Sequence, residues 1–164
     1  MQMKIPGHEA GTKFQAYPIT TEGLGMSDKN AQTQQPDWHE VTRLFLTSRI
    51  MDRIEENELA PMGKIDYQFS ARGHELPQIL LALMLKHPHD AAAVYYRSRP
   101  FVLASGLLPR EAFAGGFART GSLTEGRDGG VMFAMPARTG ATVLPTTGDV
   151  GAHYTPAAGW AQSI

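Results

Sequence analysis

Glycine is distributed unevenly along the chain, and this limits where regular structure can form. Ten of the 17 glycines fall within residues 115–159, and no long periodic element is found between Thr120 and Gly151. A stretch of this length without periodicity in a compact domain is usually a functional loop or a linker. The sequence leaves both possibilities open, and the clear helical patterns lie upstream of this stretch.

The composition excludes several classes of function. The chain has 164 residues, of which 42% are hydrophobic and 19% charged, as expected for one globular domain with a core. The absence of cysteine excludes disulfides, thiolate catalysis and iron–sulfur clusters. No apolar run of about 18 residues is present, and 15 basic residues against 16 acidic ones give a net charge of −1. We therefore expect no membrane span, no nucleic-acid partner and a cytoplasmic location.

The chain divides into a polar arm and a domain. Residues 1–36 are interrupted by glycine and proline and repeat at neither a helical nor a strand period. Such a segment buries too little apolar surface to become ordered by itself. We expect an extended arm that is either loose or lies on a partner, and a domain over residues 37–164.

Two helices are predicted in the first half of the domain. From Asp37, apolar residues recur at helical spacing for about five turns, up to Pro61-Met62-Gly63. Asp37 with Glu40 three residues later resembles a capping box. The second helix spans about His74 to His87, and its centre over 79–85 is apolar on nearly all sides, which predicts deep burial.

Shorter elements are predicted after these helices. Residues 91–96 are apolar and partly β-prone, which indicates a strand entering a turn. A brief helix from Phe101 should end at Gly106 in a left-handed cap, and Pro109 should open another helix. Thr155-Pro156 is typical of an N-cap and first helical position, and the small apolar residues after it suit close packing inside a larger body.

The segment Tyr95-Tyr96-Arg97-Ser98-Arg99 has the strongest chemical signal. Two guanidinium groups beside aromatic rings, just past a strand end, suit a phosphate or carboxylate ligand. A surface turn whose arginines pair with nearby acids fits the same pattern. The glycine-containing turn at 146–153 resembles an anion site before a helix, although its spacing fits neither the P-loop nor the dinucleotide-binding fingerprint. His87 and His89 could bind a metal, but a solvated helix end is favoured.

Taken in order, these pieces resemble one family, the α subunit of the thiamine-diphosphate-dependent 2-oxo acid dehydrogenases. This subunit belongs to the decarboxylating first component of those complexes. The resemblance runs from about Trp38 to the end of the sequence, and residues 147–159 look most like the branched-chain members. The matching residues are Arg49, Glu55, Gly73-His74-Glu75, Tyr96-Arg97, Leu107-Leu108-Pro109-Arg110-Glu111, Gly126-Arg127 and the stretch from Gly148 to Gly159.

The resemblance implies an α/β thiamine-diphosphate-binding fold. This chain would hold its N-terminal portion, with helices, a short strand and a glycine-rich loop, and the central parallel sheet would lie largely beyond residue 164. The implied oxidoreductase has its active site between α and β subunits of an α2β2 heterotetramer, or between parts of a fused chain. The implied partners are that β subunit or fused β part, a lipoyl-bearing acyltransferase and a branched-chain-like 2-oxo acid. The 164 residues by themselves are expected to be inactive.

The resemblance also implies a cofactor site. Tyr96 and Arg97 would contact the diphosphate, and Tyr95, which stands where Gln or Ala is frequent, would contribute. Gly148 and Val150 would lie against the cofactor, with Val150 propping its bent conformation. The implied chemistry is oxidative decarboxylation with acyl transfer to a lipoyl arm. The magnesium ligands would lie beyond residue 164, so no metal ligand and no catalytic residue is assigned in this chain.

Three positions depart from the family pattern. Ser98-Arg99-Pro100 stands where Asp-His-Gly is common, and residues 115–152 lack the histidine usual in the glycine-rich loop. Ala152 replaces a hydroxyl residue that helps to hold a potassium ion in some branched-chain members, so no potassium is expected here. The first departure in particular leaves a second hypothesis open, a non-catalytic binding or assembly module that keeps the fold.

Overall fold

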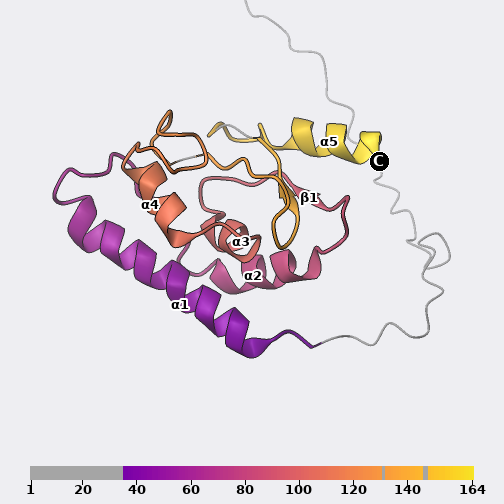
Figure 1. Cartoon of the computed structure of the whole chain (residues 1–164), viewed down its shortest axis with the longest axis horizontal. Coiled ribbons are helices and arrows are strands. Elements are labelled where there is room, and N and C mark those ends of the chain that lie inside the picture. The colour runs from indigo at the N-terminus through magenta and orange to yellow at the C-terminus, as the bar shows by residue number, and fades with distance from the viewer. Residues whose placement is uncertain (1–34, 131, 146–147) are drawn as a thin grey trace, which may run out of the picture. The chain divides into compact units, whose positions relative to one another are not determined.

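The computed structural model describes residues 35–164 except 131 and 146–147, so the predicted arm over 1–36 lies almost entirely outside the described residues. Within the described part, the chain forms short helices around a small parallel pair of strands (Figure 1). The elements in order are α1 (Trp38–Ile54), the π-helix η2 (Glu55–Leu59), α2 (Glu75–Met84), β1 (Ala91–Ala92), α3 (Arg99–Ala104), α4 (Pro109–Gly116), β2 (Thr142–Val143) and α5 (Tyr154–Ser163).

Helix α1 begins where the sequence predicts. The Asp37 carboxylate accepts hydrogen bonds from the backbone N–H groups of His39 at 3.0 Å and Glu40 at 3.4 Å, which satisfies two unpaired donors of the first turn. The reciprocal half of the predicted capping box is replaced, because Glu40 pairs with Arg43 at 2.6 Å. The helix continues into η2 and ends before Pro61, as predicted.

Helix α2 is shorter and less buried than predicted. It ends at Met84 rather than at His87, and only one side packs against α1 and α3. Ile79 and Ala82 are buried on that side, whereas Leu81 is half exposed and 78% of Met84 is exposed. The prediction of burial on nearly all sides is therefore wrong, because no described element covers the outer face of α2.

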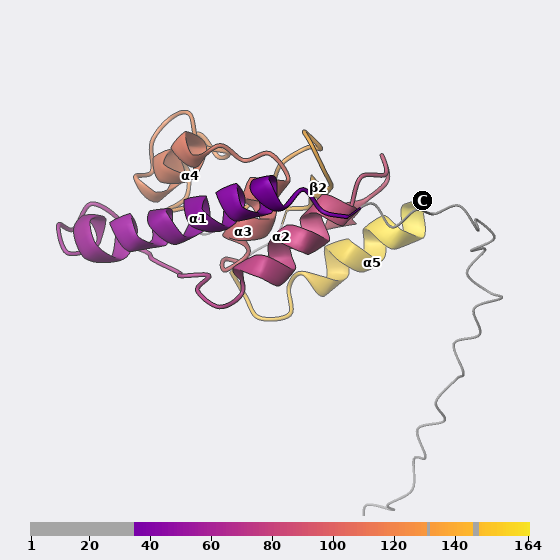
Figure 2. The same ribbon diagram turned by 90° about the horizontal axis from the view of Figure 1, so that it is seen from below.

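Helix α3 lies in the core. All six of its residues are buried, and α1 and α2 both pack against it (Figure 2). Gly106 ends the helix at φ +105, as predicted. Its N–H donates to the Leu103 carbonyl and the Leu107 N–H donates to the Val102 carbonyl, both at 3.0 Å. This is a Schellman motif, which needs the left-handed conformation that glycine adopts without strain.

The sheet in the described part consists of β1 and β2, which pair in parallel. Ala91 lies opposite Thr142 and Ala92 opposite Val143, and Met135 forms an antiparallel bridge to Val143. The predicted strand over 91–96 therefore exists, but only its first two residues pair. A parallel pair needs a long crossover connection, and here that connection contains α3 and α4. The arrangement is compatible with an α/β fold.

The first part of the glycine-rich stretch packs against the end of α4. Gly130 has φ +76, and a Cβ atom at this position would come within 2.7 Å of the Gly116 backbone nitrogen. Only glycine permits this approach of one backbone segment to another. Because Phe133, Met135 and Ala141 further along are buried in the core, this part of the stretch is a packed loop and not a free linker.

Helix α5 begins one residue earlier than the predicted cap. Thr155 lies within the helix, and no side chain caps its start. The Trp160 indole N–H donates to the His89 carbonyl at 2.7 Å, which ties α5 to the segment before β1. Ala157, Ala158 and Gly159 are exposed in this chain, so their predicted close packing stays a prediction. Figure 1 shows α1 and α5 on opposite sides of the described part.

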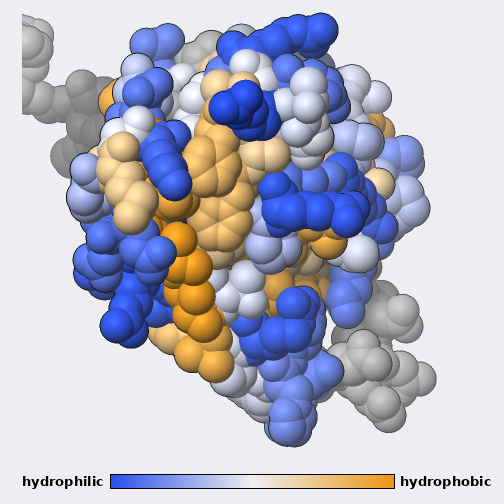
Figure 3. Space-filling view, turned by 60° about the vertical axis from the view of Figure 1, so that its left-hand side comes forward, coloured by the Kyte–Doolittle hydropathy of each residue, from blue (hydrophilic) through white to orange (hydrophobic). Residues whose placement is uncertain are grey.

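Several large apolar side chains reach the surface. On α1 these include Trp38, Leu46 and Ile50, each about half exposed. Separately, the face drawn in Figure 3 shows apolar side chains gathered in a stripe between hydrophilic ones. Continuous apolar surface of this kind is typical of contact with another chain or segment. None of the helices in residues 35–164 that the structure describes is long and apolar enough to span a membrane.

An ion pair ties the start of α4 to the segment before β2. The Arg138 Nη1 atom lies 2.7 Å from Glu111 Oε2, which also accepts from the Leu108 backbone N–H at 2.9 Å. The hydrogen bond from Arg138, foremost among several causes, lowers the pKa of Glu111. Folding therefore favours the ionised carboxylate.

We expect Glu111→Gln to lower the free energy of unfolding by about 0.5–1 kcal/mol at pH 7, since the pair is partly exposed. A lowered folded-state pKa gives stability that is present above the unfolded pKa of about 4.3 and is lost as the pH falls through the folded value. The difference between Glu111→Gln and the unsubstituted protein should thus shrink below about pH 4. Urea unfolding at several pH values measures it, with the exposed Glu58→Gln as control. A difference that persists at low pH would contradict the assignment.

Candidate functional site

The predicted site residues cluster at the turn between β1 and α3. Tyr95 and Tyr96 are partly buried there, and Arg97 is exposed. The Tyr95 hydroxyl donates to the Gly148 carbonyl at 3.0 Å, across 53 residues of sequence. The structure therefore brings two of the predicted segments together. Val150 follows two residues later, and 91% of its surface is exposed. The described residues therefore leave Val150 almost uncovered.

Ser98 forms this turn. Its backbone N–H donates to the Tyr95 carbonyl at 2.9 Å, and its hydroxyl accepts from the Tyr95 N–H at 3.1 Å. Serine stabilises turns by such local bonds. Pro100 occupies the first turn of α3, where a missing N–H leaves no helical hydrogen bond unmade. The unusual Ser98-Arg99-Pro100 segment is thus compatible with the turn that presents Tyr96 and Arg97.

Aromatic rings form a row through the site. The ring centroids of Phe69 and Tyr96 are 4.3 Å apart, those of Tyr96 and Tyr95 are 3.9 Å apart, and Tyr67 stacks on Phe69 at 6.1 Å. His153 continues the row at 5.8 Å from Tyr95. The sequence reasoning missed Tyr67 and Phe69. Their signal is the i, i+2 spacing of two aromatic residues shortly before the Gly73-His74-Glu75 motif.

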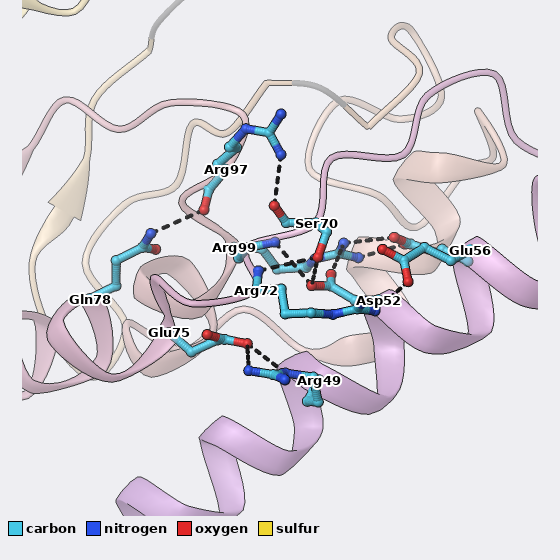
Figure 4. Close-up of polar contacts among 11 residues, drawn as sticks. Arg49, Asp52, Glu56, Ser70, Arg72, Glu75, Gln78, Arg97 and Arg99 are labelled. Carbon is cyan, nitrogen blue, oxygen red and sulfur yellow. Dashed lines mark hydrogen bonds and ion pairs between the residues drawn. The ribbon is translucent and has the colours of Figure 1, made fainter.

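Arg97 is held by its surroundings without pairing with a carboxylate. Its Nη1 atom donates to the Ser70 carbonyl at 2.8 Å, and its guanidinium lies 5.8 Å from the Phe69 ring centroid and 5.5 Å from that of Tyr96. The ion pairs of the described residues do not include it. In Figure 4 its second terminal nitrogen points away from the other residues drawn. Arg97 therefore has donors available for an anion.

Arg99 lies in the core and does not join Arg97 as a ligand. Its guanidinium contacts Asp52 at 2.7 Å and Glu55 at 2.5 Å, and all three side chains are buried (Figure 4). Burial, the largest influence, would lower the pKa of Arg99, but the hydrogen bonds and charges of Glu55 and Asp52 outweigh it and raise the pKa above its usual value. The hypothesis of paired arginines therefore applies to Arg99, which pairs with Asp52 and Glu55 inside the protein and not at its surface. The hypothesis of an anion ligand remains for Arg97, which forms no ion pair among the described residues.

The Tyr95 phenol is kept protonated. Desolvation, the largest cause, raises its pKa, and the neighbouring Tyr96 hydroxyl and the charge of Asp149 raise it further, while Arg97 acts in the opposite direction. A phenol with a raised pKa remains a hydrogen-bond donor near neutral pH. Near neutral pH the Tyr95 phenol is therefore protonated and can donate to the Gly148 carbonyl.

A pocket with aromatic walls lies beside this turn. Its walls include Tyr67, Phe69, Tyr96 and Phe133, together with the charged side chains of Glu55 and Arg99. It therefore combines aromatic rings with the buried ion pair of Arg99 and Glu55. Tyr96 belongs both to this pocket and to the cluster around Arg97.

The described residues hold no group of three or more histidine, aspartate or glutamate side chains placed for a metal ion. The predicted pair His87 and His89 forms a turn, in which the His87 Nδ1 atom accepts from the His89 backbone N–H at 3.2 Å and His87 N–H donates to Asp90 at 2.8 Å. This geometry favours the structural interpretation of both histidines over a metal site.

Comparison with known proteins supports a distant relationship. The chain is 27% identical over 107 residues to the 2-oxoisovalerate dehydrogenase subunit alpha of Bacillus subtilis (strain 168). The match covers 64% of this chain and 29% of that protein, so the chain spans less than a third of this relative's length. No family model matches the sequence. No solved structure matches it either.

Proposed function

We propose that this chain is the N-terminal, cofactor-binding part of the α subunit of a thiamine-diphosphate-dependent 2-oxo acid dehydrogenase. The proposed oxidoreductase is branched-chain-like and cytoplasmic, and works with a β subunit or fused β part and a lipoyl-bearing acyltransferase. The similarity to a 2-oxoisovalerate dehydrogenase subunit alpha supports the family. The order of motifs from Arg49 to Gly159 supports it independently of overall identity.

The single observation that carries the proposal is the hydrogen bond between Tyr95 and Gly148. The family resemblance assigns both residues to one cofactor, although 53 residues separate them in the sequence. Nothing in the local sequence of either segment requires them to meet. Their contact is what a shared cofactor site needs.

The side chains present fit a diphosphate. A guanidinium offers a planar set of N–H donors that matches phosphate oxygens. Arg97 donates one of them to the Ser70 carbonyl and forms no ion pair with a carboxylate of the described residues. The Tyr96 ring lies beside it, with its centroid 5.5 Å from the guanidinium carbon. When bound with magnesium, thiamine diphosphate supplies the carbanion chemistry that removes carbon dioxide from a 2-oxo acid. In this proposal Tyr96 and Arg97 bind and orient the diphosphate.

The structure weakens the case for a non-catalytic module. That hypothesis depends mainly on the Ser98-Arg99-Pro100 departure, because a second exposed arginine would change the charge around the diphosphate. Arg99 is instead neutralised inside the protein by Asp52 and Glu55. Arg99 therefore adds no exposed positive charge beside Arg97.

The proposal is tested on the intact protein, purified with any subunits that accompany it. Calorimetric titration with thiamine diphosphate and magnesium should show saturable binding, and thiamine without phosphate should bind far more weakly. The loaded protein should reduce an artificial electron acceptor in the presence of a branched-chain 2-oxo acid. Absence of cofactor binding would overturn the proposal. Binding without turnover would favour the non-catalytic module.

A further inference from the structure

Asp52 accepts hydrogen bonds from two segments of the chain that both support Arg97, the segment at Ser70 and Ala71 and the start of α3 at Arg99. It is fully buried on α1, and its two carboxylate oxygens have different partners. Oδ1 accepts from Arg99 Nη2 at 2.7 Å, whereas Oδ2 accepts from the Ser70 hydroxyl at 2.8 Å and from the Ala71 backbone N–H at 3.0 Å. One carboxylate thereby joins α1, the segment before α2 and the start of α3 (Figure 4).

Both groups of hydrogen bonds to Asp52 hold segments that fix the position of Arg97. The Ser70 carbonyl accepts the hydrogen bond from Arg97 Nη1 at 2.8 Å, so the segment fixed by Asp52 Oδ2 also fixes the guanidinium. Arg99, fixed by Asp52 Oδ1, lies two residues after Arg97 and anchors that end of its backbone. The side chain and the backbone of Arg97 are thus both tied to the same buried carboxylate.

An exposed arginine normally samples many rotamers, and binding a ligand must then restrict them. Here the guanidinium is already restricted by the Ser70 carbonyl and by the rings of Phe69 and Tyr96. A donor group held in its binding geometry before the ligand arrives binds more tightly, and the residues that hold it contribute to affinity without touching the ligand.

We propose that Asp52, with Arg99, is a positioning residue that orients Arg97 toward the cofactor diphosphate. This inference rests on the proposed function, because it takes thiamine diphosphate as the ligand of Arg97. It assigns to the buried ion cluster a part in cofactor affinity in addition to its part in stability. The effect of Asp52 on affinity passes through Arg97.

Glu55 provides a matched control within the same cluster. It contacts Arg99 through both oxygens, at 2.5 and 2.6 Å, as closely as Asp52 does. It forms no hydrogen bond to Ser70 or Ala71 among the contacts of the described residues. Glu55→Gln and Asp52→Asn each remove one negative charge from Arg99, but only the second also alters the support of the segment that holds the guanidinium.

The experiment is a double-mutant cycle on the intact protein with its accompanying subunits. Affinity for thiamine diphosphate with magnesium is measured by calorimetry for Asp52→Asn and Glu55→Gln, each with Arg97 present and with Arg97→Ala. Thermal unfolding of each variant is measured alongside. We expect Asp52→Asn to weaken binding about tenfold and Glu55→Gln less than about threefold when Arg97 is present. In the Arg97→Ala background, Asp52→Asn should have little further effect, because coupled residues are not additive.

Each other outcome has a definite meaning. An Asp52→Asn protein with unchanged affinity would overturn the inference, as would an equal loss in the two backgrounds, which indicates general loosening of the fold. If Asp52→Asn does not fold, Ser70→Ala replaces it, because it removes the hydroxyl contact to Asp52 and keeps the carbonyl. It should weaken binding about threefold, only when Arg97 is present, and an unchanged affinity would again overturn the inference. If the unsubstituted protein fails to bind thiamine diphosphate, the proposed function itself is wrong.

Discussion

Arg99→Met is expected to lower the free energy of unfolding by about 3–5 kcal/mol, the usual loss when one partner of a buried ion cluster is removed. The Asp52 and Glu55 carboxylates lie within 2.7 and 2.5 Å of the guanidinium and are buried with it. Without Arg99 these two carboxylates would remain in the core with no cation beside them. No interaction would then offset the free energy lost by removing their charges from water. Chemical denaturation of the intact protein measures the loss.

Two controls separate this effect from a general sensitivity to losing arginine. Arg43→Met removes the partner of Glu40, but 61% of the Arg43 side chain is exposed, so the loss should be below about 1 kcal/mol. Adding Asp52→Asn and Glu55→Gln to Arg99→Met removes the uncompensated charges and should recover much of the stability. Equal losses for Arg43→Met and Arg99→Met would show that burial of the cluster does not determine its contribution.

Arg97→Ala should weaken binding of thiamine diphosphate by roughly one to two decades and disturb folding little. A hydrogen bond to a charged group contributes about 1.5–3 kcal/mol, which corresponds to that change in affinity. Because the Arg97 side chain is exposed and forms no ion pair among the described residues, the free energy of unfolding should change by less than about 1 kcal/mol. Calorimetric titration with magnesium present measures the affinity.

The conservative variants sharpen this prediction. Arg97→Lys should recover only part of the affinity, since it keeps the charge and loses the planar set of donors. Tyr96→Phe should cost less than Arg97→Ala, because only one hydroxyl is removed. An unchanged affinity in a properly folded Arg97→Ala protein would remove Arg97 from the site and weaken the assignment to the dehydrogenase family.

Local chemistry in the sequence was sufficient to predict the main helices. Asp37 accepts from the first-turn N–H groups, Gly106 ends α3 in a left-handed cap, and Pro109 opens α4, as predicted. Each of these signals acts between neighbours a few residues apart, so the sequence contains all of the interaction. Apolar periodicity placed α1 correctly for the same reason. It overestimated the burial of α2, because burial depends on which other elements cover a face.

The sequence also predicted a candidate site, but it did not determine how this part of the structure is built. It singled out Tyr95, Tyr96, Arg97 and Gly148, and the structure places Tyr95 against Gly148. The family resemblance, more than the spacing of these residues, connected the two segments. Tyr67 and Phe69 were missed because Tyr67 stacks on Phe69, and Phe69 joins the site only through its ring contact to Tyr96, which lies 27 residues later in the chain.

Only the tertiary structure showed that Arg97 and Arg99 have different surroundings. In the sequence both arginines follow the same strand and flank the same serine. The residue pattern therefore allowed each of them either to bind an anion or to pair with a nearby acid. The acids that neutralise Arg99 are Asp52 on α1, 47 residues away, and Glu55 on η2, 44 residues away. They become neighbours of Arg99 only when these elements pack against α3. Burial and ion pairing between distant segments are properties of the packed chain. For this reason the residue pattern indicated two candidate arginines at this turn and the resemblance assigned Arg97 to the diphosphate, but only the fold showed that Arg99 is paired with buried acids.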